Sequence, residues 1–390
     1  MKRLPFILTA FVLFISISDA LQAQTAGKIN VVTTAVPFLR ISPDARAGGM
    51  GELGIATPPD ANSSFYNLAK TPFAQNNTGI GLTYTPWLKD LGLNDVYLLS
   101  VAGYHKLDDQ QSLSASLRYF SLGNIQFTDY SGSELGVGRP RELGADIGYS
   151  RKLSNNMALG LALRYIHSDL AAGYASNGNT YKPGNAVAAD ISFYYNGASE
   201  NGQGWKYGVA LTNLGSKIGY TNDATQKEYI PANLGLGVAY TKIFDEQNKI
   251  TFGLDINKLL VPTPPTSQDN GGPIDSASLA TYHNQSVVGS WFKSFGDAPG
   301  GFSEELQEIY ASIGGEYTYN DQFSFRAGYF YENKNKGGRQ YFTLGIGIKY
   351  NVVGLNFSYL VPSGSGITRN PLSNTIRFGL VFDLNGPSKE

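Results

Sequence analysis

The sequence predicts an all-β fold: a transmembrane antiparallel β-barrel of about 14 strands with an N-terminal plug or periplasmic segment. Three observations predict it. Segments of about ten residues alternate strictly between apolar and polar positions, charged side chains lie in the middle of the polar face, and the connections are alternately short and long. Ten residues is roughly the length that a tilted strand needs to cross a bilayer. With 46 Gly, 25 Tyr, 21 Phe and only 16% charged residues, the composition also favours paired strands over helices.

Residues 1–23 are predicted to be a secretory signal peptide. Lys2 and Arg3 precede an apolar run from Leu4 to Ile17, and small residues follow up to Ala23. The alternative is a retained N-terminal anchor, but this run is shorter than the roughly 20 apolar residues of a transmembrane helix. We therefore expect cleavage after Ala23.

Residues 24–77 precede the first strand and are rich in Gly, Pro, Asp and Asn, which excludes a long regular element. We expect this segment either to fold into the lumen as a plug or to form a periplasmic tail. Its candidate lumen residues are Arg40, Asp44, Arg46 and Glu52. Because buried charges need partners, we expect them to form internal ion pairs or to seal the lumen.

Residues 78–390 are predicted to form the barrel, and the run from Tyr341 to Tyr350 shows the pattern well. Its large apolar side chains share one face: Phe342, Leu344, Ile346, Ile348 and Tyr350. The other face carries Tyr341, Thr343, Gly345, Gly347 and Lys349. Successive side chains of a strand point to opposite faces, so the run has one apolar surface and one polar, small-residue surface.

Fourteen such segments are expected, an even number as is usual for bacterial barrels. They begin near Thr78, Asn94, Gln111, Arg141, Asn156, Asn185, Trp205, Ala232, Lys249, Ile309, Gln322, Gln340, Val352 and Asn374.

The polar face carries the charges, which distinguishes a barrel from a soluble sandwich. The candidate lumen residues on the strands are Arg118, Arg164, Asp255, Arg326 and Arg377, accompanied by Asp146, Asp190 and Glu316. Both signs share one face, so we expect ion pairs that brace a wet lumen rather than acid–base catalysis. Six tyrosines are expected on the apolar face near strand ends, at the membrane interface: Tyr104, Tyr149, Tyr165, Tyr240, Tyr319 and Tyr359.

The connections are expected to be short on the periplasmic side, where both ends of the chain should lie, and long outside. The longest, residues 258–308, exceeds ordinary structureless loops and suggests a functional element. Trp291, Phe292 and Phe295 in this loop belong to a partly apolar segment that can form a short helix. We expect a binding or capping element here rather than a merely variable surface loop.

No feature indicates an enzyme, a cofactor or a metal site. The chain has no Cys, and its net charge of -1 gives no basic surface for nucleic acid. The histidines are expected to lie far apart, with His105 and His167 at opposite ends of the barrel and His283 in the long loop. Phosphate-binding, metalloprotease and nucleophile-elbow motifs are missing.

One stretch has a specific resemblance: TTAVPFLRISPDARAGGMGE at Thr33 to Glu52, followed by Asp60, Ala61, Ser63 and YNLAK at Tyr66 to Lys70. It resembles the segment before the barrel in the PorV family. These proteins are outer-membrane components of the Bacteroidetes type IX secretion system and belong to the FadL-like group of fourteen-stranded barrels. Beyond Glu52 the resemblance is architectural, in length, strand number and long outer loops.

The resemblance implies an outer-membrane protein that binds the C-terminal signal domain of secreted cargo. It would deliver this cargo from the translocon barrel to a sortase-like attachment complex on the cell surface, with outer-membrane lipid around it. The alternative is a FadL-type transporter of hydrophobic small molecules. Such transporters typically carry an Asn-Pro-Ala turn in the plug; Asn67 and Ala69 fit this turn, while Leu68 replaces the proline.

Overall fold

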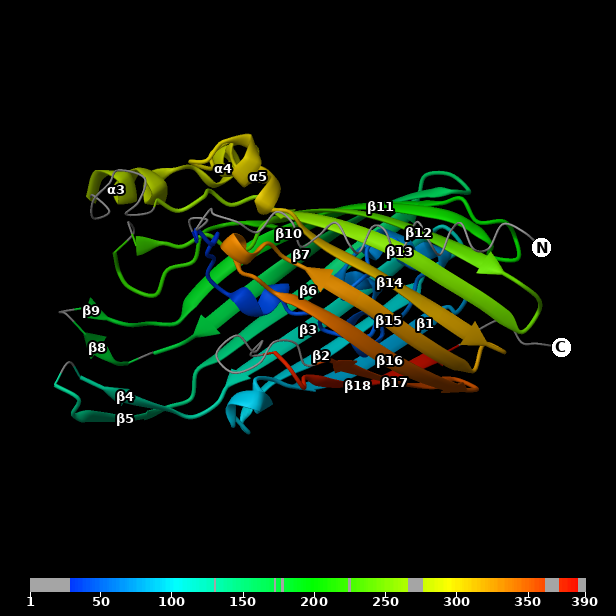
Figure 1. Ribbon diagram of the computed structural model, residues 1–390, viewed down its shortest axis with the longest axis horizontal. Coiled ribbons are helices and arrows are strands. Elements are labelled where there is room, and N and C mark those ends of the chain that lie inside the picture. Colours follow the sequence, from blue (N-terminus) through cyan, green and yellow to red (C-terminus); the bar gives the residue numbers. More distant parts are fainter. Residues whose placement is uncertain are drawn as a thin grey trace, which may run out of the picture.

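Fourteen antiparallel strands close into one barrel, in which the first strand also pairs with the last (Figure 1). The computed structural model describes residues 29–384, apart from 130, 172, 177–178, 224–225, 266–275 and 362–371. The signal-peptide prediction for residues 1–23 therefore lies outside the described residues. Within the described part, no helix has both the length and the apolar character needed to cross a membrane.

The predicted fourteen strands are confirmed. They are β1 Thr78–Pro86, β2 Val96–Lys106, β3 Gln111–Leu122, β6 Arg141–Lys152, β7 Met157–Asp169, β10 Gly184–Asn196, β11 Gly204–Gly215, β12 Asn233–Ile243, β13 Asn248–Leu259, β14 Tyr310–Tyr319, β15 Phe323–Tyr331, β16 Gln340–Tyr350, β17 Val353–Leu360 and β18 Ile376–Leu384.

The alternation along each strand separates an exterior that faces lipid from a lumen that is filled. In β16, Tyr341 and Thr343 are buried, whereas Phe342 is 60% exposed and Leu344 is exposed as well. Aromatic rings gather at both ends of the exterior. At one end, the ring centre of Tyr97 lies 5.7 Å from that of Tyr84 and 6.2 Å from that of Tyr119. Trp205 and Tyr240 pack 4.8 Å apart at the other end, so two aromatic bands mark the membrane interfaces.

Tyr104 does not face lipid as predicted. It is 4% exposed and points into the lumen, where its hydroxyl donates to the carbonyl of Asn76 at 3.2 Å. The inward face of β2 is apolar because it packs against chain inside the barrel, where Leu98 and Phe38 share one core cluster. Apolar alternation therefore does not identify the outer face of a strand whose inner face is also covered.

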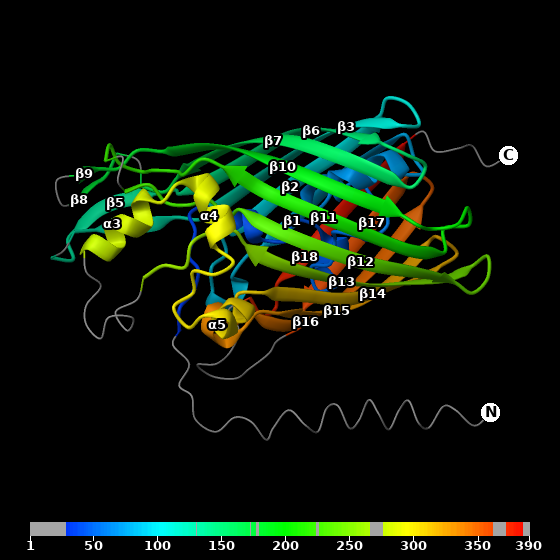
Figure 2. The ribbon, with the colours of Figure 1, turned by 90° about the horizontal axis from the view of Figure 1, so that it is seen from above.

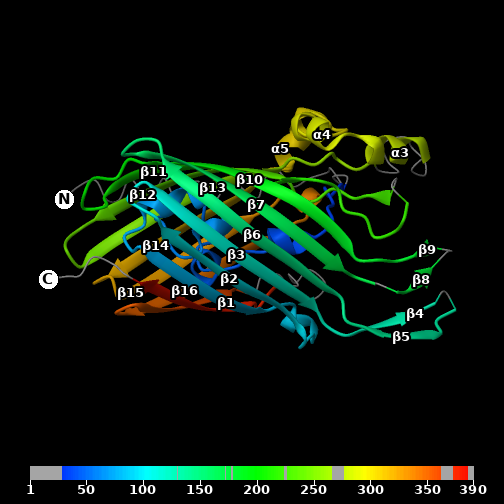
Figure 3. The same ribbon diagram turned by 180° about the vertical axis from the view of Figure 1, so that it is seen from behind.

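The long connections all lie at one end of the barrel, which we call the outer end (Figures 1 and 3). They carry two β-ribbons, formed by β4 Ile125–Thr128 with β5 Glu134–Gly138 and by β8 Ala175–Ser176 with β9 Asn179–Thr180. Residues 260–309, the outer loop, contain the helices α3 Ser276–Asn284, α4 Val287–Lys293 and α5 Phe302–Gln307. Two short 3-10 helices, η4 Lys89–Leu91 and η6 Lys334–Lys336, lie in other connections of this end.

Residues 29–77, the plug, fold inside the barrel (Figure 2). They form only short elements: η1 Pro37–Arg40, α2 Ala45–Gly48, η2 Ser63–Phe65 and η3 Leu68–Phe73. Asp44 caps α2 by accepting a hydrogen bond from the Ala47 N–H at 2.9 Å, and Asn67 caps η3 by accepting one from the Ala69 N–H at 3.1 Å. Such caps satisfy backbone donors that a one-turn helix leaves unpaired, so the turns keep their shape without regular structure.

The plug runs the length of the lumen. At the outer end, Asn30 donates its backbone N–H to Asn335 at 3.0 Å and its side chain to Glu304 at 3.3 Å. At the opposite end, the Asn77 carbonyl accepts from the Lys106 N–H at 2.8 Å. The two ends of the chain lie outside the described residues. The barrel strands start and finish on the periplasmic side, whereas the chain at Asn30 lies at the outer end. The reason is that the plug crosses the lumen before β1 begins.

Cysteine labelling tests this topology, because the chain has no cysteine of its own. Ile29 is 75% exposed beside the outer connections. We expect a membrane-impermeant maleimide to label Ile29→Cys in intact cells. The control is Asp109→Cys, in the periplasmic turn after β2, which should be labelled only after the outer membrane is permeabilised. Labelling of both variants only after permeabilisation would contradict the arrangement.

Candidate functional site

The first half of the plug is held by a cluster of buried charges around Glu316. The carboxylate of Glu316, on β14, accepts two hydrogen bonds from the Arg46 guanidinium at 3.0 and 2.8 Å. Arg326, the cross-strand neighbour on β15, donates to the same carboxylate at 2.6 Å. Arg46 also pairs with Asp60 of the plug at 2.8 Å. Two hydrogen bonds to one carboxylate fix the orientation of the Arg46 side chain as well as its position.

Two further ion pairs join plug and barrel. Glu52 accepts from the Tyr341 hydroxyl at 2.8 Å and from Arg377 at 3.2 Å. Nearer the outer end, Arg40 donates to Glu332 at 3.1 Å. The structure therefore brings Arg40 and Glu52, together with Arg377, into contacts between plug and barrel.

The remaining candidate residues act in two other ways. Asp255 accepts from the backbone N–H groups of Gly54 and Ile55 at 2.7 and 2.8 Å, and Arg118 donates to the Leu39 carbonyl at 2.8 Å. Asp44 stays within the plug, where it accepts from the Tyr66 hydroxyl at 2.6 Å.

Arg164 is different, because its partners Asp146, Asp190 and Asn213 belong to the barrel wall. It pairs with Asp146 on β6 and with Asp190 on β10 at 2.9 Å, and it also donates to Asn213 on β11. This network ties four neighbouring strands together rather than holding the plug.

Three plug residues with buried contacts were not predicted as site residues: Asp60, Tyr66 and Lys70. The Lys70 ammonium is buried and donates to the Gly54 carbonyl at 2.6 Å and to the Thr57 hydroxyl at 3.2 Å. All three lie in the stretch that carries the family resemblance, which was the available signal. A plug without periodicity does not reveal which side chains meet.

Leu68, which stands where a proline was expected, is buried against the barrel wall. A Cβ atom added at Gly148 or Gly160 would come within 2.8 or 2.6 Å of the Leu68 side chain. Glycine at both wall positions therefore makes room for this leucine. The neighbouring Asn67 side chain donates to the carbonyls of Ile55 and Phe193 at 3.1 and 2.9 Å.

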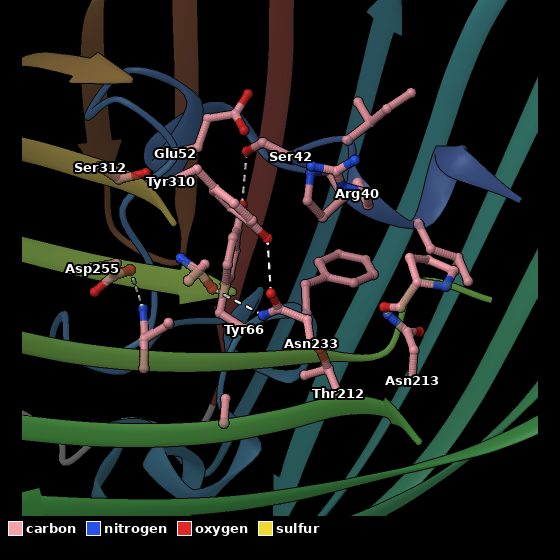
Figure 4. A pocket seen from close by; sticks show the side chains of 18 of the residues that line it. Arg40, Ser42, Glu52, Tyr66, Thr212, Asn213, Asn233, Asp255, Tyr310 and Ser312 are labelled. Atoms are coloured by element: carbon pink, nitrogen blue, oxygen red, sulfur yellow. Dashed lines mark hydrogen bonds between the residues drawn. The ribbon is translucent and has the colours of Figure 1, made fainter. Parts of the chain in front are cut away.

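A cavity of about 110 Å³ lies between the plug and the strands β11 to β15 (Figure 4). Its lining is mixed: polar and charged residues such as Arg40, Glu52, Tyr66, Asn233 and Asp255 alternate with apolar ones such as Leu39, Ile55 and Phe65. A dry apolar cavity that binds benzene measures roughly 150 Å³. This cavity is smaller and has charged groups such as Arg40 and Glu52 in its lining, which a hydrocarbon ligand cannot pair with.

The outer loop exposes a patch of apolar side chains. Phe292 on α4 is 75% exposed and Phe302 on α5 is 76% exposed; Val288 and Phe295 are also exposed. Trp291 is partly buried. Large exposed apolar patches on a folded protein mark surfaces that bind a partner.

Ion pairs hold α5, and with it this loop, on the barrel rim. Lys258, at the end of β13, binds Glu305 at 3.0 Å and Glu308 at 2.6 Å. Lys336 of η6 binds Glu304 at 2.5 Å and Glu308 at 2.9 Å. Burial opposes ionisation of Glu304, but the hydrogen bonds from Lys336, the Gly300 N–H and Asn30, together with the charge of Lys336, outweigh it and keep the pKa of Glu304 below its usual value. These ion pairs anchor α5 to the barrel rim.

Buried hydrogen bonds also hold the start of the outer loop. Thr263 donates to Asp297 at 3.1 Å from its hydroxyl and at 3.2 Å from its N–H. Burial raises the pKa of Asp297 in spite of these two bonds.

Comparison with known proteins decides the family. The family model described as "Type IX secretion system protein PorV" matches residues 23–266, more than half of the chain, including the plug. The chain belongs to the PorV family. No curated protein sequence matches it.

Several solved structures of transporters and channels are similar to this chain, at low sequence identity. The toluene transporter TbuX of Ralstonia pickettii is 11% identical over 87% of this chain and 97% of its own, with a TM-score of 0.51. The monoaromatic hydrocarbon channel CymD is 11% identical over 88% and 98%, also with a TM-score of 0.51. A FadL homologue of Pseudomonas aeruginosa is 11% identical over 91% and 99%, with a TM-score of 0.46. At this identity the likeness shows the fold alone.

Proposed function

We propose that this outer-membrane barrel of the type IX secretion system binds the C-terminal signal domain of secreted cargo. It then delivers the cargo from the translocon barrel to the sortase-like attachment complex at the cell surface. The observation that carries the proposal is the group of exposed aromatic side chains at the outer end, on a loop whose helix α5 is anchored to the barrel rim by ion pairs. Aromatic anchors in a fixed geometry supply most of the binding energy of protein interfaces.

The lumen favours this role over transport of hydrophobic small molecules. The plug is tied to the wall by at least three groups of ion pairs, around Glu316, Glu52 and Glu332. The space beside it is small and has charged groups in its lining. A transporter for apolar ligands needs a continuous apolar path, and these contacts oppose one. The proposed role needs partners but no catalysis. We also propose that residues 1–23 are removed during export, before the barrel inserts into the outer membrane.

Replacing two exposed aromatic side chains tests the loop. Phe292→Ser combined with Phe302→Ser is expected to weaken binding of a purified cargo C-terminal domain at least 30-fold, since one hot spot contributes about 2 kcal/mol. Phe295 is left in place because its ring also contacts the Lys258 ammonium at 5.8 Å. The measurement is titration of the detergent-solubilised barrel with the labelled domain.

The matched control is Phe244→Ser, which removes an equally exposed aromatic side chain from the periplasmic turn after β12. It should leave cargo binding unchanged. Unchanged binding in the double variant would exclude this surface. Deleting the gene should, in addition, cause unprocessed secreted proteins to accumulate in the periplasm, and normal secretion after the deletion would exclude the proposed role.

A further inference from the structure

The cavity beside the plug lies toward the outer end of the barrel. It is lined by Asn233 at the start of β12, Asn257 near the end of β13 and Tyr310 at the start of β14. These positions are all outer strand ends, because β12 and β14 run inward from that end and β13 runs toward it. The cavity thus lies on the same side of the membrane as the aromatic patch of the outer loop.

A buried arginine lines this cavity with most of its hydrogen-bonding capacity unused. Arg118 is 3% exposed, and its only hydrogen bond within the described residues goes to the Leu39 carbonyl. Its Nε atom is buried without a partner, and its guanidinium lies 4.7 Å from the Phe65 ring centre. A guanidinium carries five N–H donors, and leaving buried donors unpaired costs free energy.

The nearest carboxylates do not serve Arg118, because Arg164 and other donors occupy them. Asp146 binds Arg164 and the Ser116 hydroxyl, and Asp190 binds Arg164 and the Asn213 N–H. These charges balance Arg118 at a distance without a direct hydrogen bond. Arg118 therefore retains the geometry of an arginine that receives an anionic oxygen atom.

Two other lining residues have unpaired buried atoms. The Nε atom of Arg40, like that of Arg118, is buried without a hydrogen-bond partner. Asp255 uses one carboxylate oxygen for the plug N–H groups, whereas its Oδ1 atom is buried without a partner. Arg118, Arg40 and Asp255 all line the cavity, so two guanidinium groups that can pair with a carboxylate and one carboxylate that can accept from an N–H group surround it. A polypeptide presents this pair of groups, a carboxylate and a neighbouring amide N–H, at its carboxyl-terminal residue, whereas an acidic side chain would bring chain on both sides of it into a cavity of this size.

We propose that this cavity binds the carboxyl-terminal residue of a polypeptide. The terminal carboxylate lies against Arg118 and Arg40, and the amide N–H of the same residue faces Asp255. A volume of about 110 Å³ suits one terminal residue and excludes a folded domain. The inference rests on the proposed function, because the cargo domain that reaches the outer loop also ends in a free carboxylate.

The test uses the complete barrel and a cargo C-terminal domain prepared with either a free terminal carboxylate or a terminal amide. We expect the amide to weaken binding about 10-fold or more, which is the change in affinity that the loss of one hydrogen bond to a charged group typically causes. In Arg118→Met the two forms should bind equally. Arg118→Lys should keep part of the preference because it keeps the charge. Arg141→Met, an exposed arginine at the outer rim, is the control and should keep all of it.

The other outcomes separate the explanations. Equal binding of both forms by the unmodified barrel overturns the cavity proposal and leaves the proposed function intact. Sodium acetate that abolishes the preference at millimolar concentration overturns the polypeptide assignment, because the site then takes any small carboxylate. If neither form binds, the proposed function fails and the inference fails with it. A folding defect in Arg118→Met would appear as loss of the heat-modifiable band on denaturing gels. In that case the test is Arg118→Lys, in which a preference for the free carboxylate as large as that of the unmodified barrel would contradict the proposal.

Discussion

Glu316→Ala is expected to lower the free energy of unfolding by about 3–5 kcal/mol, the usual loss when one partner of a buried charge cluster is removed. Glu316 accepts hydrogen bonds from Arg46 of the plug and Arg326 of β15. Without it, two buried guanidinium groups face each other with no carboxylate between them. The measurement is chemical unfolding in detergent, followed by tryptophan fluorescence. Protease cleavage after Arg46 should also become faster as the plug loosens.

Two variants make this result specific. Glu246→Ala removes an exposed carboxylate from the turn after β12 and should change the unfolding free energy by less than about 0.5 kcal/mol. Adding Arg326→Met to Glu316→Ala should restore part of the loss, since an apolar side chain replaces an unpaired charge. A loss below 1 kcal/mol for Glu316→Ala alone would show that the cluster does not hold the plug.

The barrel was predictable because its signal is local. A strand such as β16 shows its period of two within eleven residues, and the lipid around the barrel requires that pattern on nearly every strand. Strand β2 is the exception that shows the limit. Its inward face packs against the plug and is apolar too. Leu98 and Tyr104 therefore follow the expected period of two but point into the lumen, whereas the apolar alternation predicts that they face lipid.

The contacts of the plug were not predictable in the same way. The charges of Arg46 and Glu52 are evident in the sequence, but their partners Glu316 and Arg377 lie 270 and 325 residues away. Both signs occur on many strands, and nothing in the sequence selects one pairing. The outer loop shows the same limit. Its aromatic segment is visible in the sequence, whereas the anchoring by Lys258 and Lys336 depends on connections that meet only in the folded barrel.

The plug also depends on glycines in the wall, at a place where the two backbones touch. The plug turns at Met50 and Gly51, and Gly51 has a φ of 69°, which favours glycine. A Cβ atom added at Gly328 of β15 would lie 2.1 Å from the Met50 carbonyl carbon and 2.2 Å from the Gly51 nitrogen. One added at Gly314 of β14 would lie 2.4 Å from the Met50 oxygen. These atoms belong to the main chain, so no side-chain rotation can relieve the clash.

Gly328→Ala is therefore expected to displace the plug turn and open an aqueous path through the barrel. Overpacking typically costs about 1–3 kcal/mol, and here the shift also strains the ion pairs of Arg46 and Glu52 on either side of the turn. In planar lipid bilayers the variant should show ion conductance well above that of the unmodified barrel. Gly354→Ala adds the same methyl group on β17, where the nearest atom is 3.7 Å away, and should leave the conductance unchanged. If the turn at Met50 closes the lumen, displacing its backbone must change the ion conductance. Equal conductance in all three proteins would therefore mean that this turn does not close the lumen.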